Sequence, residues 1–123
     1  MLNEKFMEVI GHEGVVSIIS WGESEPHVVN TWNSYLTLTD DGRILIPAAG
    51  MRRTQKNTAI NEKVKLTLGS KEVMGYSYPG TGFLMEGTAR FIESGAEYDM
   101  MFTKFPFLSR VLEITVTSLK QTL

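Results

Sequence analysis

The stretch LTLTDDGRILI, residues 36–46, decides the fold class of this chain. Leucine alternates with threonine before Asp41-Gly42, and isoleucine recurs at every second position after it. An Asp-Gly pair between two alternating runs is a strong short-range signal for a β-hairpin. Strands with one polar and one apolar face are typical of antiparallel sheets, so this stretch predicts a mainly β protein.

Further strands and a few short helices are predicted on both sides of the hairpin. Apolar residues at helical spacing predict an N-terminal helix over residues 2–10. Strands are expected at residues 15–21, 27–32, 65–70, 83–91 and 112–117, helices at 54–63 and 96–104, and a turn at 79–82. This pattern predicts a small antiparallel β-barrel with short helices, formed by residues 1–123 as a single domain.

Composition excludes several classes of function. The chain has 123 residues, 12 Lys and Arg against 14 Asp and Glu, and no Cys. With a net charge of −2, the protein lacks the broad positive field of proteins that bind nucleic acids or anionic membranes. Neither a nucleic acid nor a membrane is therefore expected as a partner. Without Cys there can be no disulfide, iron–sulfur cluster or thiolate metal site, and two His residues argue against an imidazole site. The lack of a signal peptide or a long apolar run predicts a cytoplasmic protein.

One segment has the features of a phosphate-binding site. Ala48-Ala49-Gly50 follows the second hairpin strand and precedes Met51-Arg52-Arg53-Thr54, where a helix is expected to begin. Small residues allow a ligand to approach the backbone, and a helix N-terminus offers free N–H groups and a partial positive charge. Arg and Thr add charge-assisted and neutral donors. The alternative interpretation is a solvated basic patch at the start of a surface helix, and the segment lacks the Gly-Lys-Ser/Thr of a Walker A loop.

A second segment, Asn30-Thr31-Trp32-Asn33-Ser34-Tyr35, allows two interpretations. Its amides, hydroxyls and aromatic rings can hydrogen-bond to and stack on a planar heterocycle. On spacing alone, the favoured interpretation is that Trp32 and Tyr35 are core residues and that the Asn and Ser residues are ordinary turn formers. The last six residues are expected either to fray or to be held at a subunit interface. No catalytic triad or pair of carboxylates is suggested by spacing, so no catalytic residue is predicted.

Several long strings resemble a known family over essentially the whole chain. VNTWNSYL at residues 29–36 and PGTGFL at 79–84 are the most specific, and GVV at 14–16, TLGS at 67–70 and QTL at 121–123 accompany them. They resemble the small FMN-binding proteins of the split-barrel flavoprotein superfamily, which also includes pyridoxamine-phosphate oxidases and flavin reductases. The resemblance implies a Greek-key split barrel that forms a homodimer and binds FMN at the dimer interface.

The resemblance also implies which residues bind FMN. Arg53 and Thr54 are expected to hold the phosphate with help from Asn30 and Thr31, and Leu123 is expected to reach the partner's flavin. The ring is expected to lie along Pro47, Ala48, Ala49, Gly50 and Met51, with Trp32 and Tyr35 nearby and Asn33 in the same motif. Two positions depart from the family pattern. Arg53 replaces a lysine, and a tryptophan expected near residues 105–107 is absent, with Phe107 the nearest match.

Two functions are consistent with these features. The first is an FMN-binding protein that passes electrons between redox partner proteins, since no acid–base or nucleophilic group accompanies the expected flavin. The alternative is an enzyme, an NAD(P)H-dependent flavin reductase or another FMN-dependent oxidoreductase, with the Tyr76-Ser77-Tyr78 loop shaping a substrate entrance. Pyridoxamine-phosphate oxidase activity is not expected, because the additional C-terminal segment with substrate-binding arginines has no counterpart here.

Overall fold

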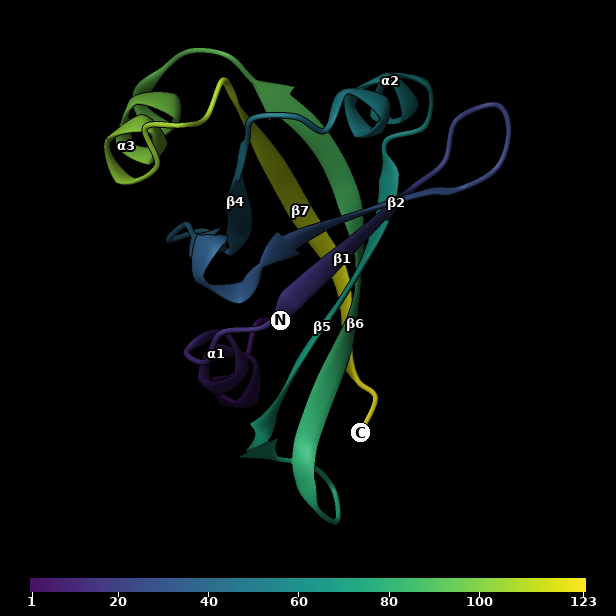
Figure 1. The fold of residues 1–123 in the computed structure, drawn as a ribbon, viewed down its shortest axis with the longest axis vertical. Helices are drawn as coiled ribbons and strands as arrows, with labels where there is room; N and C mark the ends of the chain where they lie inside the picture. The colour runs from purple at the N-terminus through teal and green to yellow at the C-terminus, as the bar shows by residue number, and fades with distance from the viewer.

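A computed structural model describes residues 1–123 and shows one curled antiparallel sheet with three helices at its margins (Figure 1). The seven strands have the order β2-β1-β5-β6-β7-β4-β3, and every pairing is antiparallel. The strands are β1 (Val15–Ser20), β2 (His27–Trp32), β3 (Thr37–Leu38), β4 (Arg43–Ala48), β5 (Lys63–Met74), β6 (Pro79–Ile92) and β7 (Arg110–Gln121). The helices are α1 (Glu4–Ile10), α2 (Arg52–Ile60) and α3 (Ala96–Lys104), and a short 3-10 helix spans Asn33–Tyr35. The expected split barrel is confirmed.

The core lies on the concave face of the sheet. Strand residues alternate between this face and the outside, so Val16 and Ile18 of β1 are buried while Val15 is exposed. Helix α1 closes one side of the barrel with two fully buried residues, Phe6 and Val9. The ring of Phe6 meets that of Phe83 edge-on, with centroids 5.7 Å apart. Apolar burial of this kind is the main stabilising contribution to such a domain.

The predicted hairpin at residues 36–46 is confirmed. Thr37 pairs with Leu45 and Leu38 with Ile44, which joins β3 to β4. Gly42 supplies the positive φ of the turn, at 84°. The structure adds that β4 also pairs with β7, so the hairpin forms one end of the sheet.

The prediction of a strand end at Gly69-Ser70 and a turn at residues 79–82 is wrong. β5 continues to Met74, Pro79 is the first residue of β6, and the turn between them lies at residues 75–78, where the Gly75 N–H donates to the Tyr78 carbonyl at 2.8 Å. Gly69 instead faces Gly82 across the two strands. A Cβ on Gly69 would lie 2.6 Å from the Thr81 carbonyl oxygen, so glycine here permits close strand contact instead of a turn.

Other element boundaries also differ from the prediction. Helix α2 ends at Ile60, so Lys63 belongs to β5 and not to the helix. The first strand ends at Ser20, and β7 extends at both ends beyond residues 112–117. A register shift between Glu86 and Gly87 of β6 bends this long pair of strands, which lets the sheet curl. The predicted helix at residues 96–104 is confirmed as α3.

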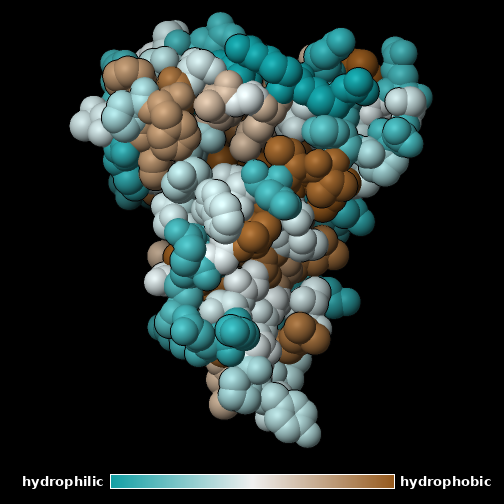
Figure 2. All heavy atoms as spheres, in the orientation of Figure 1, coloured by the Kyte–Doolittle hydropathy of each residue, from teal (hydrophilic) through white to brown (hydrophobic).

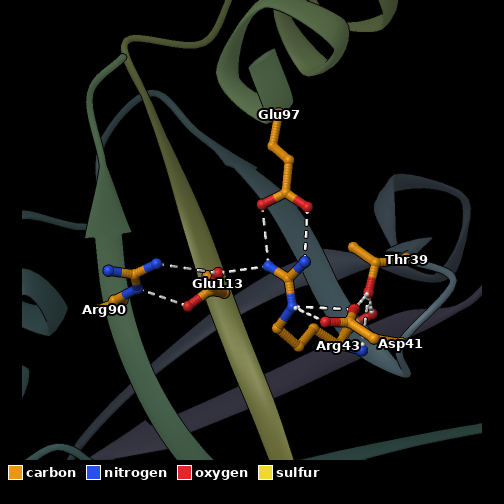
Figure 3. A network of polar contacts seen from close by, with 6 residues as sticks. All are labelled: Thr39, Asp41, Arg43, Arg90, Glu97 and Glu113. Atoms are coloured by element: carbon orange, nitrogen blue, oxygen red, sulfur yellow. Dashed lines mark hydrogen bonds and ion pairs between the residues drawn. The ribbon is translucent and has the colours of Figure 1, made fainter. Parts of the chain in front are cut away.

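A network of charged side chains fastens α3 and the hairpin to the sheet (Figure 3). Arg43 of β4 donates to both oxygens of Glu97 on α3, at 2.9 and 2.7 Å, and also pairs with Glu113 of β7. Arg90 of β6 pairs with the same Glu113 at 2.6 Å. Burial acts to raise the pKa of Glu113, but hydrogen bonds from Arg90 and Arg43 outweigh it and hold that pKa below its usual range. The network therefore depends on ionised carboxylates.

None of the three helices is long and apolar enough to cross a membrane.

Candidate functional site

The start of helix α2 carries an unsatisfied buried hydroxyl. Strand β4 ends at Ala48, and Met51 adopts the left-handed conformation, with φ 63° and ψ 32°, just before the helix. The first helical hydrogen bond joins the Gln55 N–H to the Met51 carbonyl at 2.9 Å, so earlier N–H groups have no acceptor within the helix. Thr54 is fully buried and its Oγ1 has no hydrogen-bond partner. A buried hydroxyl without a partner costs stability, which points to an acceptor supplied by a ligand.

The surroundings of Thr54 suit an anion. Arg52 and Arg53 are both exposed, and the ion pairs of the chain involve other cations. Gly50 faces open space, since a Cβ there would meet no atom within 4 Å. Positive charge, free N–H groups and an orphaned hydroxyl converge at one helix start, so the residues fit a phosphate group.

Helix α2 also brings the predicted phosphate segment to the β1–β2 side of the sheet. It packs against β1, β2 and β6, beside the label of β2 in Figure 1. Asn57, one turn after Thr54, donates from Nδ2 to the Ser20 hydroxyl at the end of β1, at 3.1 Å. The structure therefore places the two segments singled out from the sequence on adjacent elements.

The residues of β2 divide between the two faces of the sheet. Thr31 pairs with Val16 and is buried, whereas Asn30 and Trp32 belong to the outer face. The side-chain Oδ1 of Asn30 accepts a hydrogen bond from the Ser17 hydroxyl at 3.1 Å. Trp32 is 45% exposed, so its interpretation as a core residue is wrong and its ring is accessible to a ligand.

Asn33 has a structural task that the sequence did not reveal. Its side chain is buried, and Nδ2 donates to the carbonyls of His12 at 2.9 Å and Gly69 at 3.3 Å. Asn33 thus ties the end of the first helix to β5, while its Oδ1 has no partner. The Asn33 amide group makes its hydrogen bonds with residues outside α2. The predicted role of Asn33 in FMN binding stays a prediction.

Tyr35 belongs to an aromatic cluster with the segment that follows α3. Its ring lies 5.3 Å from that of Phe105 and 5.5 Å from that of Phe107, between ring centroids. Phe107, at the position nearest to the expected tryptophan, is 51% exposed. The cluster therefore presents an aromatic surface beside β3, and the contacts between Tyr35 and these rings hold it together.

The C-terminal tail is ordered along its own sheet. The Thr122 N–H donates to the Gly82 carbonyl at 2.9 Å, and the Leu123 carbonyl oxygen accepts from the Thr81 hydroxyl at 2.7 Å. The Leu123 side chain remains 66% exposed. Of the two expectations for the tail, fraying is wrong, and the reach of Leu123 to a partner's flavin stays a prediction.

Sequence reasoning missed Arg110, the first residue of β7. This side chain is 3% exposed and donates to the carbonyls of Ala49, at 3.1 Å, and Gly50, at 2.6 Å. It donates also to the Gln55 side chain at 2.9 Å. Burial and the nearby charge of Arg52 lower the pKa of Arg110 from its usual value. The pairing of β4 with β7, in which Ala48 lies opposite Arg110, brings these distant parts of the sequence together.

Pro47 and Ala48 are buried at the end of β4, while Ala49 and Gly50 are exposed. The side chains of Pro47 and Ala48 therefore lie in the protein interior, and the segment offers a ligand mainly the backbone of Ala49, Gly50 and Met51.

Comparison with known proteins identifies the family of this chain. The family model of pyridoxamine 5′-phosphate oxidase matches residues 2–122. The chain is 48% identical, over 123 residues and the full length of both, to the FMN-binding protein of Nitratidesulfovibrio vulgaris strain Miyazaki F.

Solved structures share the fold at low identity. HupZ of Group A Streptococcus has a TM-score of 0.81 at 17% identity, with 98% of this chain and 94% of that chain covered. A pyridoxamine 5′-phosphate oxidase-like protein of Lactobacillus delbrueckii has a TM-score of 0.69 at 16% identity, with 97% and 93% covered. The fold, the match over residues 2–122 and the full-length relative lead to one conclusion: this chain belongs to the pyridoxamine 5′-phosphate oxidase family of split-barrel proteins.

Proposed function

We propose that this protein binds FMN and transfers electrons between redox partners. The observation that carries the proposal is the buried, unpartnered Thr54 hydroxyl at the start of α2, beside two unpaired arginines. A relative that is 48% identical over its full length is named an FMN-binding protein, which supports FMN as the ligand.

In this proposal the residues around α2 bind and orient the cofactor. Thr54 and Arg53 donate to the phosphate, and the N–H groups of the first helical turn add to its binding. The exposed backbone of residues 49–51 lies along the flavin ring, and Trp32 and Tyr35 supply aromatic cover. FMN supplies the electron-transfer chemistry when it is bound.

Electron transfer fits this site better than acid–base catalysis does. Its polar groups are arginines, a threonine and backbone amides, which neither take up nor release a proton near neutral pH. They can bind an anion and orient a ring. We therefore infer that partner proteins approach the flavin, and that they donate electrons to it and accept electrons from it.

A second function, NAD(P)H-dependent reduction of the flavin, is favoured by one other feature. Tyr76 and Tyr78 at the tip of the β5–β6 hairpin are 73% and 78% exposed. They line a depression of about 370 Å³ together with Ser77, Gly80, Thr122 and Leu123. Aromatic rings at its edge can stack on a nicotinamide, so this hollow is the candidate entrance for a substrate.

The absorption spectrum of the purified protein tests both functions. We expect the protein to show flavin absorption and to release FMN on denaturation. We also expect that neither NADH nor NADPH rapidly bleaches the absorption of the bound flavin. A colourless protein that takes up no flavin on reconstitution would contradict FMN binding. Rapid bleaching of the flavin by either nucleotide would contradict the electron-carrier function and favour the NAD(P)H-dependent reductase.

We further propose that the protein is a homodimer with FMN at its interface. The outer face of β1 and β2 exposes Val15 and Trp32, which are directly paired, and also Val28, which pairs with Ile19 further along the same two strands. Apolar residues gather at the position of β2 in Figure 2. Such exposed apolar groups on a small protein favour burial against another chain. Sedimentation of the loaded protein at the mass of one chain would contradict this part of the proposal.

The two arginines at the start of α2 are expected to differ in their effect on FMN. Arg53→Ala should weaken FMN binding about tenfold, because a charge-assisted hydrogen bond to phosphate is lost. Arg52→Ala should weaken it less, since the resemblance to the small FMN-binding split-barrel proteins implies Arg53, and not Arg52, as the phosphate ligand. Titration of the apoprotein with FMN, followed by flavin fluorescence, measures both. Equal losses would show that the assignment of the phosphate ligand to Arg53 is wrong.

A further inference from the structure

Arg110 is a buried cation without a carboxylate partner. Its side chain is 3% exposed and its guanidinium lies over the ring of Phe91, 5.4 Å from the centroid. Arg43 and Arg90 both pair with Glu113, but none of the ion pairs of the chain includes Arg110. Burying an unpaired charge is costly, so the position of Arg110 calls for a compensating role.

The hydrogen bonds of Arg110 hold one loop. Nη2 donates to the carbonyls of Ala49 and Gly50, and Nη1 donates to the side-chain oxygen of Gln55 in α2. The neighbouring Ser109 strengthens the same attachment, with its N–H and hydroxyl donating to the Ala48 carbonyl at 3.0 and 3.2 Å. A single planar guanidinium thus joins the loop between β4 and α2 to the helix that follows it.

This attachment determines the direction of two N–H groups. In a trans peptide the carbonyl and the N–H of one unit point in opposite directions. Because the carbonyls of Ala49 and Gly50 point to Arg110, the N–H groups of Gly50 and Met51 point away from it. Neither N–H group has an acceptor within the chain. A left-handed residue after a right-handed one aligns successive N–H groups into a concave donor surface, and Met51 supplies the left-handed member.

We propose that Arg110 is a positioning residue for the flavin ring. Its planar guanidinium fixes the carbonyls of Ala49 and Gly50, and this orients the Gly50 and Met51 N–H groups toward the ring edge of bound FMN. Arg110 acts through the loop and does not touch the phosphate. This inference rests on the proposed FMN binding and adds a residue from β7 to that site.

The test is Arg110→Lys, titrated with FMN and with riboflavin, which has the same ring but no phosphate. Lysine keeps the charge and lacks the planar fork that holds two carbonyls and Gln55 together. We expect the dissociation constants for FMN and riboflavin to rise by the same factor, about tenfold. The visible absorption of the bound flavin at saturation should also shift, because its ring hydrogen bonds change. Arg90→Lys is the matched control and should leave both constants and the spectrum unchanged.

Three results would overturn the inference. Unchanged binding of both ligands would show that the fork is not needed, and a loss confined to FMN would show that Arg110 acts on the phosphate. An unshifted spectrum would show that the ring contacts do not depend on it. If circular dichroism shows that Arg110→Lys does not fold, Gln55→Ala decides, with an expected equal loss of about threefold for both ligands and unchanged binding as the contrary result. Failure of the unsubstituted protein to bind any flavin would instead refute the proposed function.

Discussion

Thr54→Val is expected to weaken FMN binding by about tenfold or more while leaving the apoprotein as stable as before. The Thr54 hydroxyl is fully buried and has no partner in the chain, so valine removes an unsatisfied polar group without breaking an internal hydrogen bond. The same change removes the proposed donor to the FMN phosphate. The free energy of unfolding of the apoprotein should therefore stay the same or rise by up to about 1 kcal/mol.

Thr58→Val is the matched control for this experiment. Thr58 lies one turn further along α2, also buried, and its hydroxyl donates to the Thr54 carbonyl at 2.9 Å. We expect this variant to change stability slightly and to leave FMN affinity unchanged. Urea unfolding of the apoproteins and FMN titrations separate the two effects. If Thr54→Val binds FMN as the unsubstituted protein does, Thr54 is not a phosphate ligand.

Glu113→Gln is expected to lower the free energy of unfolding by about 2 kcal/mol at pH 7. The Glu113 side chain is 6% exposed and accepts from Arg43 and Arg90 on the two neighbouring strands. Glutamine leaves both arginines without this carboxylate. The loss stays below that for a fully buried pair, because Arg43 is 24% and Arg90 73% exposed. Urea unfolding at pH 7 measures it.

The effect of Glu113→Gln depends on pH in a defined direction. The pKa of Glu113 is lowered in the folded protein, so its ionised form stabilises the fold above the unfolded pKa of about 4.3. That contribution is lost as the pH falls through the folded pKa. The difference between Glu113→Gln and the unsubstituted protein should therefore be full at pH 7 and should narrow below about pH 4. Glu86→Gln, which disrupts an exposed pair with Lys65 at 3.7 Å, is the control and should cost little at either pH. A difference that stays constant down to pH 3 would contradict the ionic account.

Local patterns in the sequence predicted most of the fold. Alternation around Asp41-Gly42 predicted the β3–β4 hairpin, and the helical spacing at residues 96–104 predicted α3. The errors arose where residues that usually interrupt strands are placed inside them. Gly69, Pro79 and Gly82 were assigned to strand ends and turns because glycine and proline usually interrupt strands. In the structure they lie within β5 and β6, where their role depends on the neighbouring strand. A close approach between two backbones cannot be seen in one local stretch of sequence.

The candidate site was predictable only in part, for a similar reason. The small residues and arginines before α2 indicated an anion site, and the structure adds the orphaned hydroxyl of Thr54. Arg110 and the buried task of Asn33 could not be predicted, since their partners lie far away in the sequence, at Ala49 and Gly50 and at His12 and Gly69. Their roles exist only once the sheet has closed.

The place of β7 in the strand order has a consequence for the order in which the protein matures. Within the sheet, the β3–β4 hairpin meets the rest of the barrel only through β7, which pairs β4 residues 43–48 with residues 110–115. A chain leaving the ribosome therefore exposes the hairpin without this neighbouring strand until β7 has been synthesised. Such long-range pairing makes closure a late and comparatively slow step of folding. Because Arg110 begins this strand, the loop before α2 is fastened only after β7 has been synthesised, and the proposed FMN site is completed at that stage.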